Sequence, residues 1–173
     1  LALGKRQAGS GSGFVVGEGL IMTNGHVVHG DRALRYFVFN DKLPPTEAKL
    51  VAKAYQKGQA GGSDFGLLRF TPPAGMKLPV LALNSDVQRM DKVSAWGYPG
   101  IVTQFDQGMR DILSPGKKNF TPPPVVYTEG TVSALVRDRN NASIIHTAPI
   151  SGGNSGGPLI NGKGEVVGIN TWL

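Results

Sequence analysis

The chain has 173 residues and contains no Cys, which excludes disulfides, thiolate zinc sites and a cysteine nucleophile. Its length suits one domain of ordinary size or two small lobes that share a cleft. The formal charge of +6 comes from basic residues scattered along the chain, which favours a mildly basic surface over a nucleic-acid-binding stripe. No apolar run approaches the roughly 20 residues of a membrane-spanning helix.

The 25 Gly and 12 Pro residues predict frequent turns, which argues against helical bundles and for many short strands. Twelve segments are short and rich in β-branched or aromatic residues. In chain order they cover residues 14–16, 20–22, 34–39, 48–55, 65–70, 80–83, 93–96, 125–128, 131–136, 143–147, 158–160 and 166–171. A short helix is predicted over 104–113, inside a connection over 101–124 whose length is typical of functional or mobile loops.

The predicted strands divide into six before residue 84 and six after residue 92. We therefore expect an N-terminal lobe over 1–84, a linker over 85–92 and a C-terminal lobe over 93–173, which together form one domain. No fixed-period repeat is visible, which argues against propellers and solenoids. The predicted class is all-β with two six-stranded antiparallel Greek-key barrels, because barrel closure removes exposed strand edges.

A serine surrounded by glycines is the sharpest chemical signal in the chain. It stands in the run Gly153-Asn154-Ser155-Gly156-Gly157, which predicts a tight turn with an exposed hydroxyl. Because glycines lack Cβ, backbone N–H groups can converge beside this serine, as the stabilisation of an oxyanion requires. The alternative interpretation is a plain glycine-rich hairpin.

A histidine and an aspartate in the first lobe complete the constellation. His26 follows a strand and a small-residue turn, and Asp64 opens an apolar strand. Taken singly, His26 is more often a structural hydrogen-bonding residue, and Asp64 is more often a turn or cap residue. Together with Ser155 they supply the base, the orienting carboxylate and the nucleophile of serine chemistry. This conjunction predicts a site in the cleft between the lobes.

Six segments in register carry a resemblance to a known family over nearly the whole chain. The sequence resembles trypsin-like serine proteases of the chymotrypsin double-barrel fold, and most of all the cysteine-free HtrA (Deg) type. The carrying segments are residues 11–16, 23–28, 64–68, 96–99, 153–158 and 168–171. Since relatives continue beyond the position of Thr171, the resemblance implies that the second barrel is truncated at its C-terminus.

The resemblance implies a role for each matching residue. Ser155 matches the nucleophile, His26 the general base and acid, and Asp64 the carboxylate that orients the histidine. The oxyanion hole is expected at Gly153, Asn154 and Ser155. Two further residues match substrate-binding positions: the hydroxyl of Thr171 is expected to support Asp64, and Trp172 aligns with an aromatic floor of the substrate groove.

Two positions near the serine bear on activation and specificity. Asn154 cannot form the ion pair with a new N-terminus that activates digestive relatives, and the resemblance implies a two-state oxyanion loop instead. Pro149 stands six residues before Ser155, where enzymes that cut after Lys or Arg carry Asp. Pro149 and Ile150 therefore predict a modest apolar pocket for small or medium aliphatic residues before the scissile bond.

The predicted function is hydrolysis of peptide bonds in proteins through an acyl-enzyme intermediate. The alternative is a catalytically silent, protease-like scaffold that binds peptides or proteins. A nucleic-acid partner is not expected, because aromatic residues are not interleaved with the basic ones. His26 and His29 have a spacing that metal ligands can use, but His26 is already explained by the serine chemistry, so neither a metal nor a cofactor is predicted.

Assembly and location rest on the resemblance alone. Relatives often form homo-oligomers, and they often work in the periplasm, outside the cell or at a membrane. The connection over 101–124 follows Trp96-Gly97, where related enzymes place a loop that borders the active-site cleft. Gating of substrate, assembly and a plain surface insertion all remain open for this connection.

Overall fold

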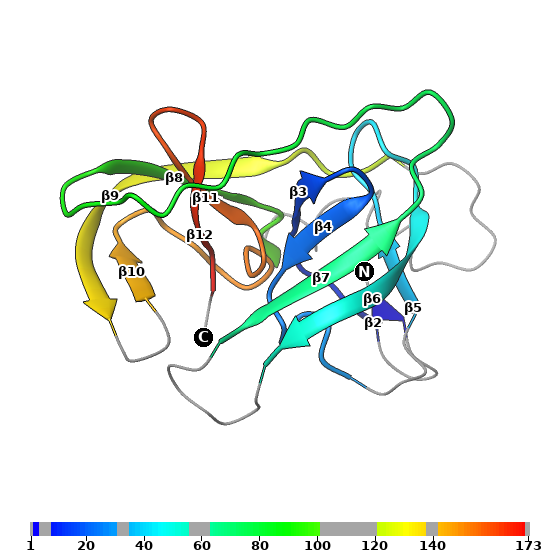
Figure 1. Ribbon diagram of the computed structural model, residues 1–173, viewed down its shortest axis with the longest axis horizontal. Coiled ribbons are helices and arrows are strands. Elements are labelled where there is room, and N and C mark those ends of the chain that lie inside the picture. Colours follow the sequence, from blue (N-terminus) through cyan, green and yellow to red (C-terminus); the bar gives the residue numbers. More distant parts are fainter. Residues whose placement is uncertain are drawn as a thin grey trace.

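Two antiparallel sheets lie side by side in the computed structural model (Figure 1), which describes residues 2–3, 8–30, 35–55, 63–100, 121–137 and 142–171. The described residues form twelve strands. These are β1 (Ala2–Leu3), β2 (Ala8–Gly9), β3 (Phe14–Gly17), β4 (Leu20–Thr23), β5 (Arg35–Val38), β6 (Thr46–Ala54), β7 (Phe65–Phe70), β8 (Lys92–Gly97), β9 (Val126–Arg137), β10 (Ala142–His146), β11 (Pro158–Asn161) and β12 (Val166–Ile169).

The first sheet contains the first seven strands in the order β2-β1-β5-β6-β7-β4-β3. Alternation along β7 explains how the sheet covers a core, because Gly66, Leu68 and Phe70 are buried while Phe65 and Arg69 face outward. The buried core on the inner face comprises Val28, Tyr36, Leu43, Ala48, Leu68 and Phe70. The pairing of β4 with β7 brings the end of β4, which precedes His26, next to the start of β7, which follows Asp64.

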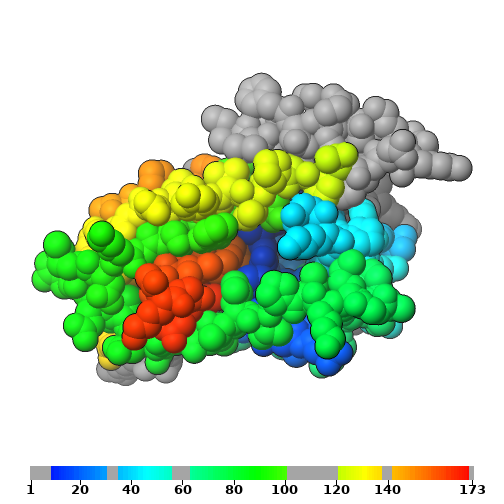
Figure 2. Space-filling view, turned by 90° about the horizontal axis from the view of Figure 1, so that it is seen from above, coloured from blue at the N-terminus to red at the C-terminus, as the bar shows by residue number. Residues whose placement is uncertain are grey.

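The second sheet contains the remaining five strands in the order β10-β9-β8-β11-β12. Strand β8 alternates in the same way, with Val93, Ala95 and Gly97 buried between more exposed neighbours. A second, separate core lies behind it and comprises Val93, Ala95, Val132, Ala148 and Leu159. In Figure 2 the hairpin of β11 and β12 and the strands β5 and β6 lie on opposite halves of the molecule.

The segment between β7 and β8 crosses from one sheet to the other (Figure 1). The strand predicted over 80–83 is wrong, because this stretch makes one isolated bridge, from Leu83 to Val166. Its backbone instead joins the two sheets. Leu81 donates its N–H to the Val15 carbonyl of β3, while the Ala82 carbonyl accepts from Val166 of β12.

The two strands predicted over 125–128 and 131–136 are one continuous strand, β9. Gly130, which lies between the two predicted strands, is part of β9 and allows close contact with the segment after β10. A Cβ at Gly130 would lie 2.1 Å from the backbone nitrogen of Ala148, so only glycine lets the segment after β10 approach β9.

The all-β, double-barrel class predicted from the sequence is confirmed. Among the described residues the strands divide into seven and five rather than six and six. The additional strands of the first sheet are the two-residue β1 and β2, which carry no strong strand signal. The helix predicted over 104–113 lies outside the described residues, as does most of the 101–124 connection.

Candidate active site

His26 and Asp64 are brought together by neighbouring strands. Strand β4 ends at Thr23, which pairs with Gly66 near the start of β7, so the residues just beyond these strand ends lie side by side. Nδ1 of His26 lies 2.7 Å from Oδ2 of Asp64, and the side chains are 29% and 19% exposed. The sequence-predicted pair therefore forms a close, partly buried contact.

Asp64 holds His26 at two points. Besides the ring contact, Oδ1 of Asp64 accepts a hydrogen bond of 2.9 Å from the backbone N–H of His26. A carboxylate only accepts hydrogen bonds, so this network assigns the ring proton to Nδ1 and leaves Nε2 as a hydrogen-bond acceptor. This is the tautomer that a general base requires.

The turn that carries His26 is held by hydrogen bonds and by close packing against neighbouring strands. The N–H of Val28 donates to the Gly25 carbonyl over 3.2 Å, which closes the turn. The Tyr36 hydroxyl on β5 donates to the Val28 carbonyl over 2.9 Å, and burial raises the pKa of this phenol. A Cβ at Gly25 would lie 2.5 Å from Cβ of Tyr55, so the turn packs tightly against the end of β6.

Ser155 lies in a buried turn that packs against the end of β4. Its carbonyl accepts a hydrogen bond of 2.8 Å from the N–H of Ser12, which belongs to the first lobe. The next residue, Gly156, has φ of +90°, and a Cβ there would lie 2.2 Å from Thr23 Oγ1 and 3.0 Å from the Asn24 nitrogen. Glycine at 156 therefore brings Ser155 to the strand end that precedes His26.

The loop before Ser155 is a tight turn. Asn154 donates its N–H to the Ser151 carbonyl over 3.0 Å, and Asn154 Oδ1 accepts from the Ser151 N–H over 3.1 Å. Gly153 occupies the third position of the turn with φ of +97°. Among the hydrogen bonds between described residues, none uses the N–H of Gly153, whereas the N–H of Asn154 is engaged within the turn.

The structure describes three of the four predicted substrate-binding residues. Thr171 Oγ1 accepts a hydrogen bond of 3.0 Å from Asn24, and the same amide donates to the Asp64 carbonyl over 2.8 Å. Ile150 packs against the core of the second lobe, and the exposed Pro149 accepts at its carbonyl from Thr128 over 2.7 Å. Trp172 lies outside the described residues.

Three residues near the site were not singled out from the sequence. Asn24 links Asp64 to Thr171, Ser12 bonds to the loop before Ser155, and the ring of Tyr55 lies 6.2 Å from that of His26. Asn24 and Ser12 both stand in the segments that carry the family resemblance. Their position within these segments, rather than a catalytic residue type, was the available signal.

The described part of the chain contains no group of three or more His, Asp or Glu residues that could hold a metal ion. Within the same residues, no helix has the length and apolar character needed to cross a bilayer.

Comparison with known proteins gives consistent names. A Synechocystis protein described as the serine protease HhoA is 31% identical over 172 residues. The serine protease HTRA1B of Danio rerio is 34% identical over 165 residues, and a DegP-like protein of Pseudomonas fluorescens, described as a periplasmic serine endoprotease, is 36% identical over 178 residues. These matches cover 96%, 94% and 98% of this chain, but the chain spans only 38%, 30% and 30% of the relatives' lengths.

A family model described as the trypsin-like peptidase domain matches residues 11–169. The matched range contains His26, Asp64 and Ser155, and the HtrA and DegP names among the relatives agree with the resemblance stated from the sequence. The chain therefore belongs to the trypsin-like peptidase family.

Proposed function

We propose that this chain is the protease domain of a serine endopeptidase, with Ser155 as nucleophile, His26 as general base and acid, and Asp64 as orienting carboxylate. The observation that carries the proposal is the double attachment of His26 to Asp64, at Nδ1 and at the backbone N–H. In the proposal, this attachment leaves Nε2 to accept the proton of the Ser155 hydroxyl. Membership of the trypsin-like peptidase family supports the same assignment.

The proposed reaction proceeds in two halves. Ser155 Oγ attacks the carbonyl carbon of the scissile bond while His26 Nε2 takes the hydroxyl proton. The tetrahedral intermediate collapses as His26 returns this proton to the leaving nitrogen, which gives a free amine and an ester on Ser155. Water then attacks the ester with His26 again as base, and the acid product leaves while Ser155 regains its proton.

The negative charge on the tetrahedral oxygen requires hydrogen-bond donors that are already in place. We assign this role to the backbone N–H groups of Gly153 and Ser155. Support comes from the positive φ of Gly153 and from its N–H, which no hydrogen bond between described residues occupies. The third predicted member, Asn154, uses its N–H and side chain to close the turn, so its proposed part is to shape the loop.

The proposed substrates are proteins that present small or medium aliphatic residues before the scissile bond. The absence of a carboxylate at Pro149 and the apolar Ile150 beside it support this preference. The substrate backbone would lie extended along the segment of Thr171 and, in the proposal, reach Trp172.

The location and assembly of the protein are also proposals. One relative is described as periplasmic, which supports placement of this chain in the periplasm or outside the cell. The resemblance to HtrA-type enzymes supports a homo-oligomer.

The proposal is tested by labelling with a serine-directed fluorophosphonate. The full native chain should be labelled, and Ser155→Ala should not be, because the label forms its bond at the serine oxygen. Ser133→Ala, which removes an exposed serine of β9, is the matched control and should label like the native chain. A folded native chain that takes no label would contradict the proposal and favour the peptide-binding scaffold.

A further inference from the structure

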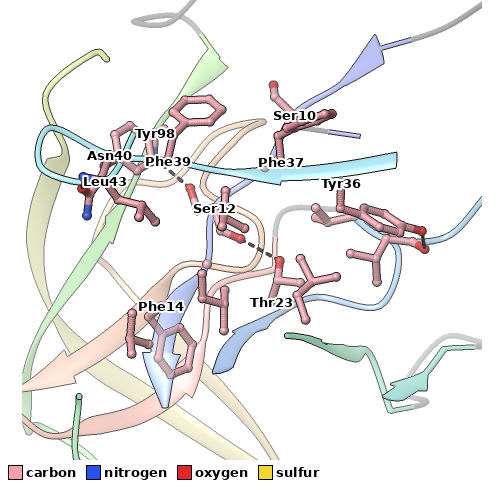
Figure 3. Close-up of a pocket in the computed structure, with 18 of the residues that line it drawn as sticks. Ser10, Ser12, Phe14, Thr23, Tyr36, Phe37, Phe39, Asn40, Leu43 and Tyr98 are labelled. Carbon is pink, nitrogen blue, oxygen red and sulfur yellow. Dashed lines mark hydrogen bonds between the residues drawn. The ribbon is translucent and has the colours of Figure 1, made fainter. Parts of the chain in front are cut away.

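The Ser12 hydroxyl connects the first lobe to the loop before Ser155. Ser12 is only 5% exposed, and its Oγ donates a hydrogen bond of 2.6 Å to the Gly153 carbonyl. The same oxygen accepts a hydrogen bond of 2.9 Å from the Tyr98 N–H, as Figure 3 shows. One buried hydroxyl therefore donates to the loop before Ser155 and accepts from the segment after β8.

Both peptide groups that flank Gly153 are held by hydrogen bonds at their carbonyl oxygens, one from Ser12 and one from Gly100. Each peptide group is planar, so holding its carbonyl oxygen also fixes the direction of its N–H. The group between Gly153 and Asn154 is held by Ser12 at the oxygen and by Ser151 at the nitrogen. The preceding group is held at the Gly152 oxygen, which accepts from Gly100 over 2.5 Å.

Ser12 contributes to both restraints. Gly100 lies two residues after Tyr98, whose backbone is bonded to the Ser12 hydroxyl, so this hydroxyl fastens the short segment that holds the Gly152 oxygen. A Cβ at Gly153 would lie 2.4 Å from the Tyr98 carbonyl, which shows how closely the segment and the loop approach. The Gly153 N–H belongs to the peptide group held at the Gly152 oxygen, so Ser12 restrains it through the Tyr98–Gly100 segment and through the adjoining peptide group after Gly153.

We propose that Ser12 is a positioning residue for the oxyanion hole, since its hydroxyl holds the peptide group after Gly153 directly and the segment that holds the peptide group before it. This inference rests on the proposed serine-protease function and adds a residue from the first lobe to that site. Stabilisation of a developing oxyanion depends on donors that are held in place before the reaction. Ser12 thus makes the geometry of a loop in the second lobe depend on correct packing of the first.

The surroundings of Ser12 match this role. A Cβ at Gly97 would lie 2.8 Å from Ser12 Oγ, and a Cβ at Gly157 would lie 3.2 Å from Ser12 Cβ. Glycines on both sides therefore leave room for a serine here and for little more. The Thr23 hydroxyl donates to the Ser12 carbonyl over 2.6 Å, which fixes the backbone of Ser12 separately from its side chain (Figure 3).

Thr23 provides a matched control. Ser12→Ala removes the bond to Gly153, whereas Thr23→Val removes a buried bond of the same length to the same residue and leaves the Gly153 peptide untouched. Both variants are expected to lower the melting temperature. A merely structural role for Ser12 would change activity no more than Thr23→Val does.

The measurements are kcat and KM on a peptide substrate and the rate of fluorophosphonate labelling, all in the full chain. Ser12→Ala should lower kcat and the labelling rate about 10²-fold with KM nearly unchanged, because a displaced oxyanion donor acts on the transition state. Thr23→Val should keep the native kcat and labelling rate. Ser12→Gly, which also removes the hydroxyl and adds no bulk between Gly97 and Gly157, should show the same selective loss in kcat and replaces Ser12→Ala if that variant does not fold.

Three results would overturn the inference, and they separate failure of the positioning role from failure of the proposed function. If the native chain is labelled and Ser12→Ala is labelled equally fast, or if Thr23→Val is slowed as much as Ser12→Ala, then only the positioning role fails. If the folded native chain takes no label, the proposed function fails and the role of Ser12 fails with it.

Discussion

Asn24 and Thr171 stand 147 positions apart in the chain and are joined by a hydrogen bond of 3.0 Å from Nδ2 to Oγ1. The same Nδ2 donates to the Asp64 carbonyl, so one amide connects the residue that carries the candidate carboxylate to the end of the second sheet. Asn24 is 1% exposed, which places this connection in the interior between the lobes. Its position two residues before His26 ties the base to the same network.

Replacing Asn24 tests this network. Asn24→Ala leaves the Asp64 carbonyl and the Thr171 hydroxyl without their shared donor, and we expect a loss of about 1–3 kcal/mol in the free energy of unfolding. Activity should fall as well, because Asp64 loses a backbone restraint. Thr171→Val removes only one of the two bonds and should cost less. Denaturant unfolding and kcat measured on both variants would contradict the network if Thr171→Val were the more damaging change.

Asp64→Asn should lower kcat on the order of 10⁴-fold while the fold is retained. In the structure, Oδ1 accepts from the His26 N–H and Oδ2 from Nδ1. If the asparagine oxygen keeps the backbone bond, its amide group faces Nδ1, which must then act as an acceptor. The ring proton moves to Nε2, which can no longer take the proton of Ser155.

The measurement for Asp64→Asn is kcat over a range of pH, with unfolding as the control for structure. Native-like unfolding with native-like activity would show that Asp64 does not set the tautomer of His26. The predicted loss does not simply add to that of Ser155→Ala, because the residues act as a unit.

The sequence predicted the all-β class and the two lobes because strand-forming segments and turn residues alternate along the whole chain. It could not predict the crossing of residues 80–83, because an apolar segment looks the same whether it pairs along its length or touches two sheets. Nor could it predict that the strands expected over 125–128 and 131–136 are one, because the close backbone approach at Gly130 is visible only in the folded chain.

The candidate site was predictable to the extent that its chemistry is carried by particular residue types. His26, Asp64 and Ser155 stand in three separate segments, and together their residue types indicated nucleophilic serine chemistry. The residues that hold these groups in place carried no such signal, because Ser12 and Asn24 act through backbone carbonyls and amides that only the folded chain brings near.

Gly153→Ala should impair the loop before Ser155. The residue has φ of +97°, which is unfavourable for alanine, and the added Cβ would lie 2.4 Å from the Tyr98 carbonyl. We expect kcat to fall by about 10²-fold or more, as for loss of an oxyanion donor. Gly162→Ala is the matched control, since a Cβ there meets nothing within 4 Å, and it should keep native activity. Equal activity of the two variants would contradict the assignment of Gly153.

The substrate preference is tested with matched peptides that differ only at the residue before the scissile bond. Peptides with Val, Leu or Ala should be cleaved faster than those with Lys or Arg, because no carboxylate stands at Pro149 to pair with a basic side chain. Pro149→Asp should raise kcat/KM for the basic peptides. Faster cleavage after Lys or Arg by the native chain would overturn the apolar-pocket proposal.

His146 should make the stability of the chain depend on pH. Burial lowers the pKa of this histidine below its ordinary 6.5, and a hydrogen bond with the Ala148 backbone acts in the opposite direction. Within the described residues, Nδ1 of His146 is buried without a hydrogen-bond partner. Since the unfolded chain takes up the proton first as pH falls, this contribution to stability is complete above pH 6.5 and is lost below it.

The test compares melting temperatures between about pH 7.5 and pH 5. His146→Gln removes the titrating group, so its melting temperature should fall less on acidification than that of the native chain. His29→Gln, which removes an exposed imidazole, is the control and should retain the native slope. If the melting temperature of His146→Gln falls on acidification as much as that of the native chain, other groups cause the loss of stability. A smaller fall assigns the loss to the histidine at the end of β10.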